Sequence, residues 1–388
     1  MSDIRSESRL TFWEATGILI GHGVGAGILA VPFYASRNSV WEIFLLVGLS
    51  YVFNVVLHLL IAELSLNNGG AQFVACFDRE LFSGKAKKIF TWAAFVLLGL
   101  SVVVNVSAFL TGAADVFVSW LGVSKLTGAL IFYVIGAGVV FAGMKLIGIC
   151  EKYAVLSMAA VIAVLFVATL CTELVPVRMA PGGFNNALAL FGMVSFSLSA
   201  VMSTPQVVKG LNGDVKKIRL SVFMALAVNI SLILMVTFAT ILSVGDQLTG
   251  KAALVDLAEH LGSWVSLVGY IFTLLALATS FWSNTLNLRD IVSEQTRWGK
   301  NVSWLAATAP CLLVACICII SGATFSALSR FASVIQVVTG LAIIAAYQKS
   351  RHRTGASEIL GGAGSLPVCI LVALCSLMAT VGAVIPVT

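Results

Sequence analysis

The feature that decides the fold of this chain is the stretch Gly21-His22-Gly23-Val24-Gly25-Ala26-Gly27, which lies inside the first apolar segment long enough to cross a membrane. Each of its four glycines costs roughly 1 kcal/mol of helix propensity relative to alanine. Lipid offers no partner for backbone groups freed from a helix, so an unwound stretch at that depth must line a space enclosed by protein. The stretch therefore predicts a broken first helix whose backbone faces a site for a small zwitterion and a cation.

Composition places the chain among membrane proteins. Hydrophobic residues make up 59% of its 388 residues and charged residues 10%, whereas a soluble domain carries about 25% charged residues. We expect a single all-α polytopic domain over residues 1–388, embedded in the lipid bilayer. The net charge of +6 is too modest to suggest a nucleic-acid partner, and no obligate protein partner is evident. The sequence shows no Ser/His/Asp set, metal cluster or phosphate loop, so an enzyme is not expected and no cofactor beyond a coupling ion is implied.

Hydropathy predicts about eleven membrane helices. Their expected spans are 11–36, 40–66, 89–121, 126–147, 151–175, 187–209, 218–243, 262–292, 302–321, 324–347 and 366–387. With the N-terminus in the cytoplasm, most of the 23 Lys and Arg residues fall on the cytoplasmic side, while Arg37, Lys125, Arg178 and Lys251 fall outside. This bias follows the positive-inside rule, and it predicts a multi-pass protein of the plasma or inner membrane with an external C-terminus.

The two halves of the chain carry matching interruptions. The first segment is broken by glycines and contains Pro32, and the sixth contains the serine-rich stretch 195–203 followed by Pro205. Five helices separate the two breaks, so the second half enters the membrane from the opposite side. We therefore expect a five-plus-five inverted repeat, with repeat one at about 11–175, repeat two at about 187–347 and an extra helix at about 366–387. Such paired interruptions point to a binding site at the membrane midplane.

The first break supplies backbone groups for ligand binding. Free amides of Gly25, Ala26 and Gly27, at the positive end of a half-helix, suit a substrate carboxylate. The carbonyls of Gly21 and Val24 suit a hard monovalent cation. The alternative is that the small residues only allow neighbouring helices to pack closely.

The second break supplies hydroxyl groups and an aromatic side chain for the predicted pocket. Ser197 and Ser199 can reach a substrate amine or a polar side chain, and Phe196 can line the pocket; the amine is also expected to meet carbonyls near Gly23. Alternatively, the serine hydroxyls bond to the carbonyl four residues back in an intact helix. Asn105 in the third segment either lines the pathway or bonds between helices.

The eighth segment carries a possible cation site. The carbonyl of Ala276 and the hydroxyls of Thr279 and Ser280, facing the carbonyls of the first break, would supply the neutral oxygens that Na⁺ requires. The alternative is hydrogen bonding between helices. His22, inside the first break, can take a proton near neutral pH, so it is the candidate for proton coupling, unless it is a neutral side chain bonded to a nearby carbonyl.

Together these features resemble the amino acid–polyamine–organocation superfamily, which has the leucine-transporter fold. The stretch from Gly21 to Pro32 is similar to the first-helix break of its sodium-coupled symporters. The resemblance implies that Ala276, Thr279 and Ser280 belong to the second sodium site of that fold. The first sodium site looks absent, because Ile28 stands where an asparagine is expected.

Within the superfamily, the chain most resembles the amino acid/auxin permeases and the hydroxy/aromatic amino acid permeases. Their GxGAGxLxxP-like first segment matches residues 23–32, and their G-(D/N)-x-K-K-(L/I)-R run matches residues 213–219. The resemblance implies a transporter with eleven helices. Serines stand in the sixth-helix break, where the hydroxy/aromatic permeases usually carry histidine or glycine.

We therefore expect Na⁺-coupled symport of a neutral L-amino acid by alternating access, with medium or large apolar or aromatic side chains favoured because the predicted pocket lining is small and uncharged. Two alternatives stay open at this point. The first is that the chain is a proton-coupled permease that uses His22. The second is that it is a membrane sensor, which binds an amino acid without transporting it.

Overall fold

The computed structural model describes residues 9–249, 253–322, 325–353 and 355–387, and within these ranges every regular element is a helix. The elements in chain order are α2 (Phe12–Gly23), η1 (Ala26–Leu29), α3 (Val31–Ala35), α4 (Val40–Asn67), α5 (Phe73–Glu80), α6 (Lys87–Leu121), α7 (Lys125–Ala142), α8 (Met144–Leu170), α9 (Phe184–Ser197), η2 (Val201–Ser203), α10 (Thr204–Gly210), α11 (Val215–Val244), η3 (Gly245–Gln247), α12 (Ala253–Leu261), α13 (Trp264–Thr296), α14 (Lys300–Ser321), α15 (Phe325–Arg351), η4 (Gly361–Gly364) and α16 (Leu366–Val384). The all-α class is confirmed.

The helices of the described chain match the predicted membrane segments. Nine spans are long and apolar enough to cross a bilayer, and the pair formed by α2 and the helical residues 27–35, bent by 51°, makes up to ten. The 27-residue helix α15 occupies the remaining predicted position. The protein is therefore a multi-pass membrane protein. Residues 250–252, which include Lys251, and residue 324 at the start of the predicted tenth segment lie outside the described ranges.

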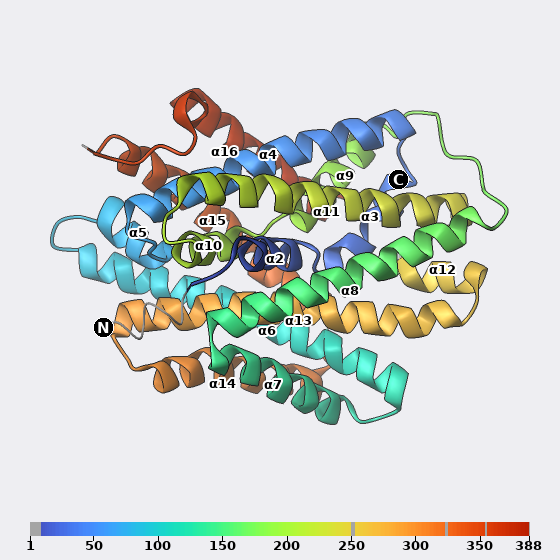
Figure 1. Cartoon of the computed structure of the whole chain (residues 1–388), viewed down its shortest axis with the longest axis horizontal. Helices are drawn as coiled ribbons and strands as arrows, with labels where there is room; N and C mark the ends of the chain where they lie inside the picture. Colours follow the sequence, from blue (N-terminus) through green and yellow to red (C-terminus); the bar gives the residue numbers. More distant parts are fainter. Residues whose placement is uncertain (1–8, 250–252, 323–324, 354, 388) are drawn as a thin grey trace.

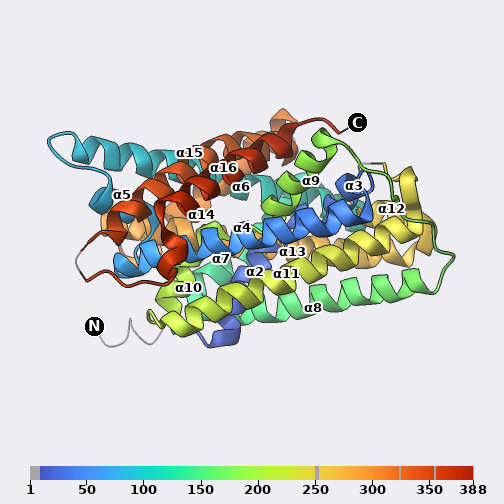
Figure 2. The same ribbon diagram turned by 90° about the horizontal axis from the view of Figure 1, so that it is seen from above.

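The long helices run along the longest axis of the molecule, and the short helix α2 lies among them (Figure 1). Helix α2 packs against α8, α11 and α13, whereas α9 packs against α16, and α15 against α6. Figure 2 shows the same bundle from above, with α15 and α16 on the side away from α8. The first broken helix is thus enclosed by helices from both halves of the chain.

One predicted boundary is wrong, and the error affects the site. The fourth and fifth segments were expected to meet near residues 148–150, but α7 ends at Ala142 and α8 begins at Met144. Gly143 separates them with φ 108°, a conformation that residues with a Cβ rarely adopt. The shift places Glu151 two turns inside α8. The short helices α5 and α12 also occupy stretches expected to be loops.

Two polar contacts fix the start of α2. Thr11 and Glu14 form a capping box, in which the Thr11 hydroxyl accepts from the Glu14 backbone and the Glu14 carboxylate accepts from the Thr11 backbone, so two free amides of the first turn are satisfied. Lys145 Nζ also donates to Glu14 Oε1 at 2.8 Å and Oε2 at 2.6 Å. The entrance of the broken helix is therefore tied to the first turn of α8.

Candidate functional site: two helix breaks joined by polar side chains

Both predicted breaks are present. Helix α2 ends at Gly23, and the chain continues through Val24 and Gly25 into the 3-10 turn η1. Helix α9 ends at Ser197, and residues 198–200 are irregular before η2 and α10. Pro205 stands at the beginning of α10, where its missing N–H removes no helical hydrogen bond. The two halves of the chain thus each place an interrupted helix in the bundle.

The first two glycines of the broken stretch each face a polar side chain from another helix. A methyl group on Gly21 would overlap Glu151 Oε2 of α8 and would lie 3.2 Å from Thr279 Cβ of α13. A methyl group on Gly23 would overlap Nδ2 of Asn229 on α11. A Cβ at either position would force the end of the facing side chain to move, so these two glycines allow Glu151 and Asn229 to approach the broken helix closely.

The other two glycines face α13 and the second break. A methyl group on Gly25 would lie 2.9 Å from Ser280 Oγ. A methyl group on Gly27 would lie 3.0 Å from Ser197 Oγ and 3.1 Å from the Phe196 ring. Four alternate residues of one short stretch therefore meet polar groups from α8, α9, α11 and α13.

Three of the five residues predicted to hold a cation, Gly21, Ala276 and Thr279, meet where α2 packs against α13. The Thr279 hydroxyl donates to the Gly21 carbonyl at 2.9 Å and to the Ala276 carbonyl at 3.0 Å. Ser280 lies beside Gly25, and Val24 follows the last residue of α2. Backbone carbonyls and hydroxyls are hard oxygen ligands that suit a small monovalent cation, so the donor set fits Na⁺ chemically. Its role as a metal site stays a prediction.

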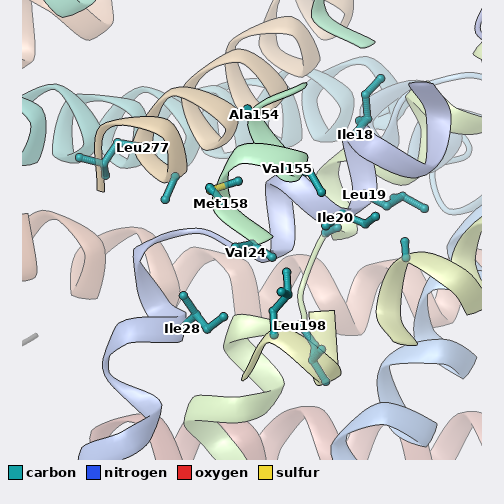
Figure 3. Close-up of a cluster of buried hydrophobic side chains, with 14 of the residues drawn as sticks. Ile18, Leu19, Ile20, Val24, Ile28, Ala154, Val155, Met158, Leu198 and Leu277 are labelled. Atoms are coloured by element: carbon teal, nitrogen blue, oxygen red, sulfur yellow. The ribbon is translucent and has the colours of Figure 1, made fainter. Parts of the chain in front are cut away.

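Apolar side chains surround this junction. In Figure 3, Val24 lies in a buried cluster with Met158 of α8, Leu198 of the second break and Leu277 of α13. Ile28 also belongs to it and is 0% exposed. Electrostatic interactions are stronger in such a dry setting than in water. The polar groups of the junction are therefore held away from competing solvent.

His22 links the two breaks. Its Nδ1 lies 2.6 Å from Ser203 Oγ in η2, and its Nε2 lies 3.4 Å from Asn284 Nδ2 in α13. The imidazole of α2 therefore contacts side chains of both η2 and α13. Proton coupling through His22 stays a prediction.

Three of the remaining predicted residues, Phe196, Ser197 and Ser199, lie at the second break, whereas Asn105 lies on α6. The Ser197 hydroxyl donates to the Met193 carbonyl at 2.9 Å. This is the alternative role of the serine, a hydrogen bond to the carbonyl four residues earlier in the helix. The backbone N–H of Ser199 donates to the Phe196 carbonyl at 3.1 Å, and the Phe196 side chain is 52% exposed. Asn105 is half-buried on α6. Substrate binding by these residues, and by the amides of residues 25–27, stays a prediction.

Sequence reasoning missed three polar residues of this region. His58 of α4 is fully buried; its Nε2 accepts from the Ala200 backbone N–H at 2.9 Å, and its Nδ1 lies 2.6 Å from the Asn54 carbonyl. His58 thereby holds the irregular backbone of the second break in place. Buried polar atoms with no hydrogen-bond partner in the described chain include Glu151 Oε2 and both amide atoms of Asn229.

The sequence carries a weak indication of two of these residues. Asn229 interrupts an apolar run in the seventh predicted segment, and His58 does the same in the second. Glu151 was placed at a helix end, where a carboxylate is unremarkable. Only the earlier start of α8 shows that it lies inside the bundle.

This geometry defines the class of protein: a membrane transporter of the leucine-transporter fold, built around two broken helices. The chain belongs to the tryptophan/tyrosine permease family, whose sequence pattern matches residues 9–381. Among curated proteins, none matches the sequence significantly.

Solved structures support the fold. The chain is similar to MhsT, solved in complex with L-phenylalanine, with 13% identity, a TM-score of 0.60 and coverage of 97% of this chain and 99% of that one. It is also similar to Mhp1, a nucleobase-cation-symport-1 family transporter in a closed conformation with bromovinylhydantoin bound, with 12% identity, a TM-score of 0.63 and coverage of 97% and 91%. The predicted leucine-transporter fold is therefore confirmed, and the family match supports the predicted likeness to amino acid permeases.

Proposed function

We propose that the protein is a cation-coupled symporter of neutral L-amino acids with large or aromatic side chains, and that Na⁺ is the coupling ion. The substrate carboxylate rests on the amides of residues 25–27, and its amine meets carbonyls near Gly23 and Phe196. The cation binds between the α2 break and the oxygens of Ala276, Thr279 and Ser280. Rocking of one helix set against the other then gives alternating access to the site.

One observation carries this proposal: the Thr279 hydroxyl already contacts the Gly21 carbonyl at 2.9 Å. A cation placed among these oxygens would pull the broken helix and α13 together. Because both the cation and the substrate use the same unwound backbone, each would favour the arrangement that the other needs, which is the thermodynamic basis of coupling.

The nature of the substrate follows from the lining and the family. The candidate substrate contacts Phe196, Ser197, Ser199 and Asn105 carry no formal charge, so a charged substrate side chain would be desolvated there without a partner. The family name points to tryptophan and tyrosine, and the similar transporter MhsT was solved with L-phenylalanine. These support a large neutral substrate over a charged one.

Uptake into proteoliposomes tests the proposal. We expect inward Na⁺ gradients to drive accumulation of labelled tryptophan, tyrosine or phenylalanine, and lysine and glutamate not to compete. Thr279→Ala and Ser280→Ala should weaken stimulation by Na⁺ more than substrate binding, since each removes one cation oxygen. Uptake that persists in choline and stops with a proton ionophore would contradict Na⁺ coupling and favour His22; binding without accumulation would indicate a sensor.

The orientation belongs to the same proposal. The distribution of Lys and Arg supports an N-terminus in the cytoplasm and a C-terminus outside, in the plasma or inner membrane. Labelling of a single cysteine introduced near each end, with a reagent that does not cross membranes, tests this arrangement in intact cells.

A further inference from the structure

We propose that Glu151 is a direct, anionic ligand of the coupling cation, which adds a carboxylate to the neutral oxygens of the α2–α13 site. This inference rests on the Na⁺ coupling proposed above and names a ligand from a third helix. The carboxylate converges on the cation site because Glu151 Oε2 and Thr279 Cβ both crowd the Cβ position of Gly21.

The hydrogen bonding of Glu151 leaves one oxygen free. The side chain is 0% exposed, and Oε1 accepts from the Ser283 hydroxyl of α13 at 3.0 Å. Oε2 has no hydrogen-bond partner in the described chain. A buried carboxylate oxygen without a partner is expensive, so an unpaired oxygen pointed at Gly21 indicates a ligand that arrives from elsewhere.

Within the described part of the chain, no basic side chain pairs with this carboxylate. The ionisable residues on α8 and on the four helices packed against it are Lys145, Cys150, Lys152 and Tyr153 on α8, Glu14 and His22 on α2, Lys125 and Tyr133 on α7, Lys216, Lys217 and Arg219 on α11, and Tyr270, Arg289, Asp290 and Glu294 on α13. Among the described residues, none of these forms a hydrogen bond or ion pair with Glu151.

The neighbouring lysines are engaged elsewhere. Lys145 pairs with Glu14 at 2.6 Å. Lys152 lies 4.6 Å from the ring centroid of Tyr153, whose side chain is 59% exposed. The neighbouring lysines therefore do not neutralise Glu151, which leaves this role to a proton or to the bound cation of our proposal.

The consequence is a site that holds its cation by charge as well as by coordination. Neutral oxygens alone replace the hydration shell of an ion, whereas a carboxylate in a dry setting also attracts its charge strongly. Glu151 on α8 also adds a third helix to the contacts that the cation draws together. Cation binding would then tie α2 to α8 as well as to α13.

Sodium binding to purified protein tests the inference. We would measure the thermal unfolding midpoint against NaCl concentration, with choline chloride holding ionic strength constant, for wild type, Glu151→Gln, Glu151→Asp and Glu173→Gln. Glu173 lies in the exposed stretch after α8 and is the matched control. We expect Glu151→Gln to raise the apparent Kd for Na⁺ by about tenfold or more, because it removes the ligand charge while keeping the size. Glu151→Asp should be milder, and Glu173→Gln should match wild type.

Substrate counterflow separates this inference from the proposed function. Exchange of labelled for unlabelled phenylalanine needs transport but no ion gradient, so wild type and Glu173→Gln should show it at saturating NaCl. A cooperative thermal unfolding transition without Na⁺ shows that Glu151→Gln folds. An unchanged Kd for Na⁺ in the folded Glu151→Gln variant overturns the role of Glu151, and counterflow in wild type leaves the transporter assignment standing. Absence of counterflow in wild type overturns the proposed function itself. Absence of Na⁺ binding in wild type overturns the inference.

Discussion

Adding one methyl group to Gly23 should impair transport, because the structure leaves no room for it. The Cβ of an alanine at this position would overlap Asn229 Nδ2 and would lie 3.5 Å from the Ser197 carbonyl. Asn229 is 0% exposed, so its amide can move only by displacing packed neighbours. Overpacking of this kind costs typically about 1–3 kcal/mol.

The expected loss of transport follows from that energy. If the broken backbone must keep its present shape to bind substrate and cation, 1–3 kcal/mol corresponds to a loss of roughly 5- to 150-fold in the rate or affinity of uptake. The unpartnered amide of Asn229 loses no hydrogen bond when it moves, so the cost is purely steric. The measurement is initial uptake of labelled phenylalanine, normalised to the amount of protein in the membrane.

Gly48→Ala is the matched control. Gly48 lies in α4, and a Cβ there would have no atom within 4 Å, so alanine should be neutral or should stabilise the helix by up to roughly 1 kcal/mol. If Gly23→Ala and Gly48→Ala take up substrate equally well, the close approach of Asn229 to the break has no functional importance and the reasoning is refuted.

Three further changes test other parts of the structure. His58→Phe should lower the free energy of unfolding by about 1–3 kcal/mol, because it leaves the Ala200 N–H buried without its acceptor; an unchanged thermal midpoint would show that the contact is unimportant. Asp214, the N-cap of α11, accepts from the Lys217 backbone N–H, and this bond together with the Lys217 ammonium lowers the pKa of its carboxyl. The resulting stabilisation is present at neutral pH and is lost as the pH falls through the lowered pKa, so the difference in unfolding midpoint between wild type and Asp214→Ala should shrink in acid, and a constant difference would argue against it. Ser199→Phe should reduce uptake of tryptophan more than uptake of alanine, and equal losses would mean that Ser199 does not line the pocket.

Much of the fold could be predicted because a bilayer imposes strong local rules. Backbone groups in lipid must bond within their own helix, so apolar runs of sufficient length have to be helices, and clusters of glycine or proline inside them have to be breaks. This is why the glycines of residues 21–27 and the serine-rich stretch before Pro205 were recognised without knowledge of any contact. The boundary between α7 and α8 was placed too late, because Gly143 and Gly148 lie in the same stretch and the sequence does not show which of them ends the helix.

By itself, the sequence determined that this is a membrane protein and that its first and sixth helices are broken. It also identified residues 276–280 as a source of hydroxyl and carbonyl oxygens. Only the tertiary structure decided what faces each glycine of the first break. Glu151 and Asn229 are separated from Gly21 and Gly23 by many residues, and their meeting depends on how α8 and α11 pack against α2. Local sequence patterns report the bonds that a segment makes with itself. The buried carboxylate beside the predicted cation site results from packing between helices, which no single segment encodes.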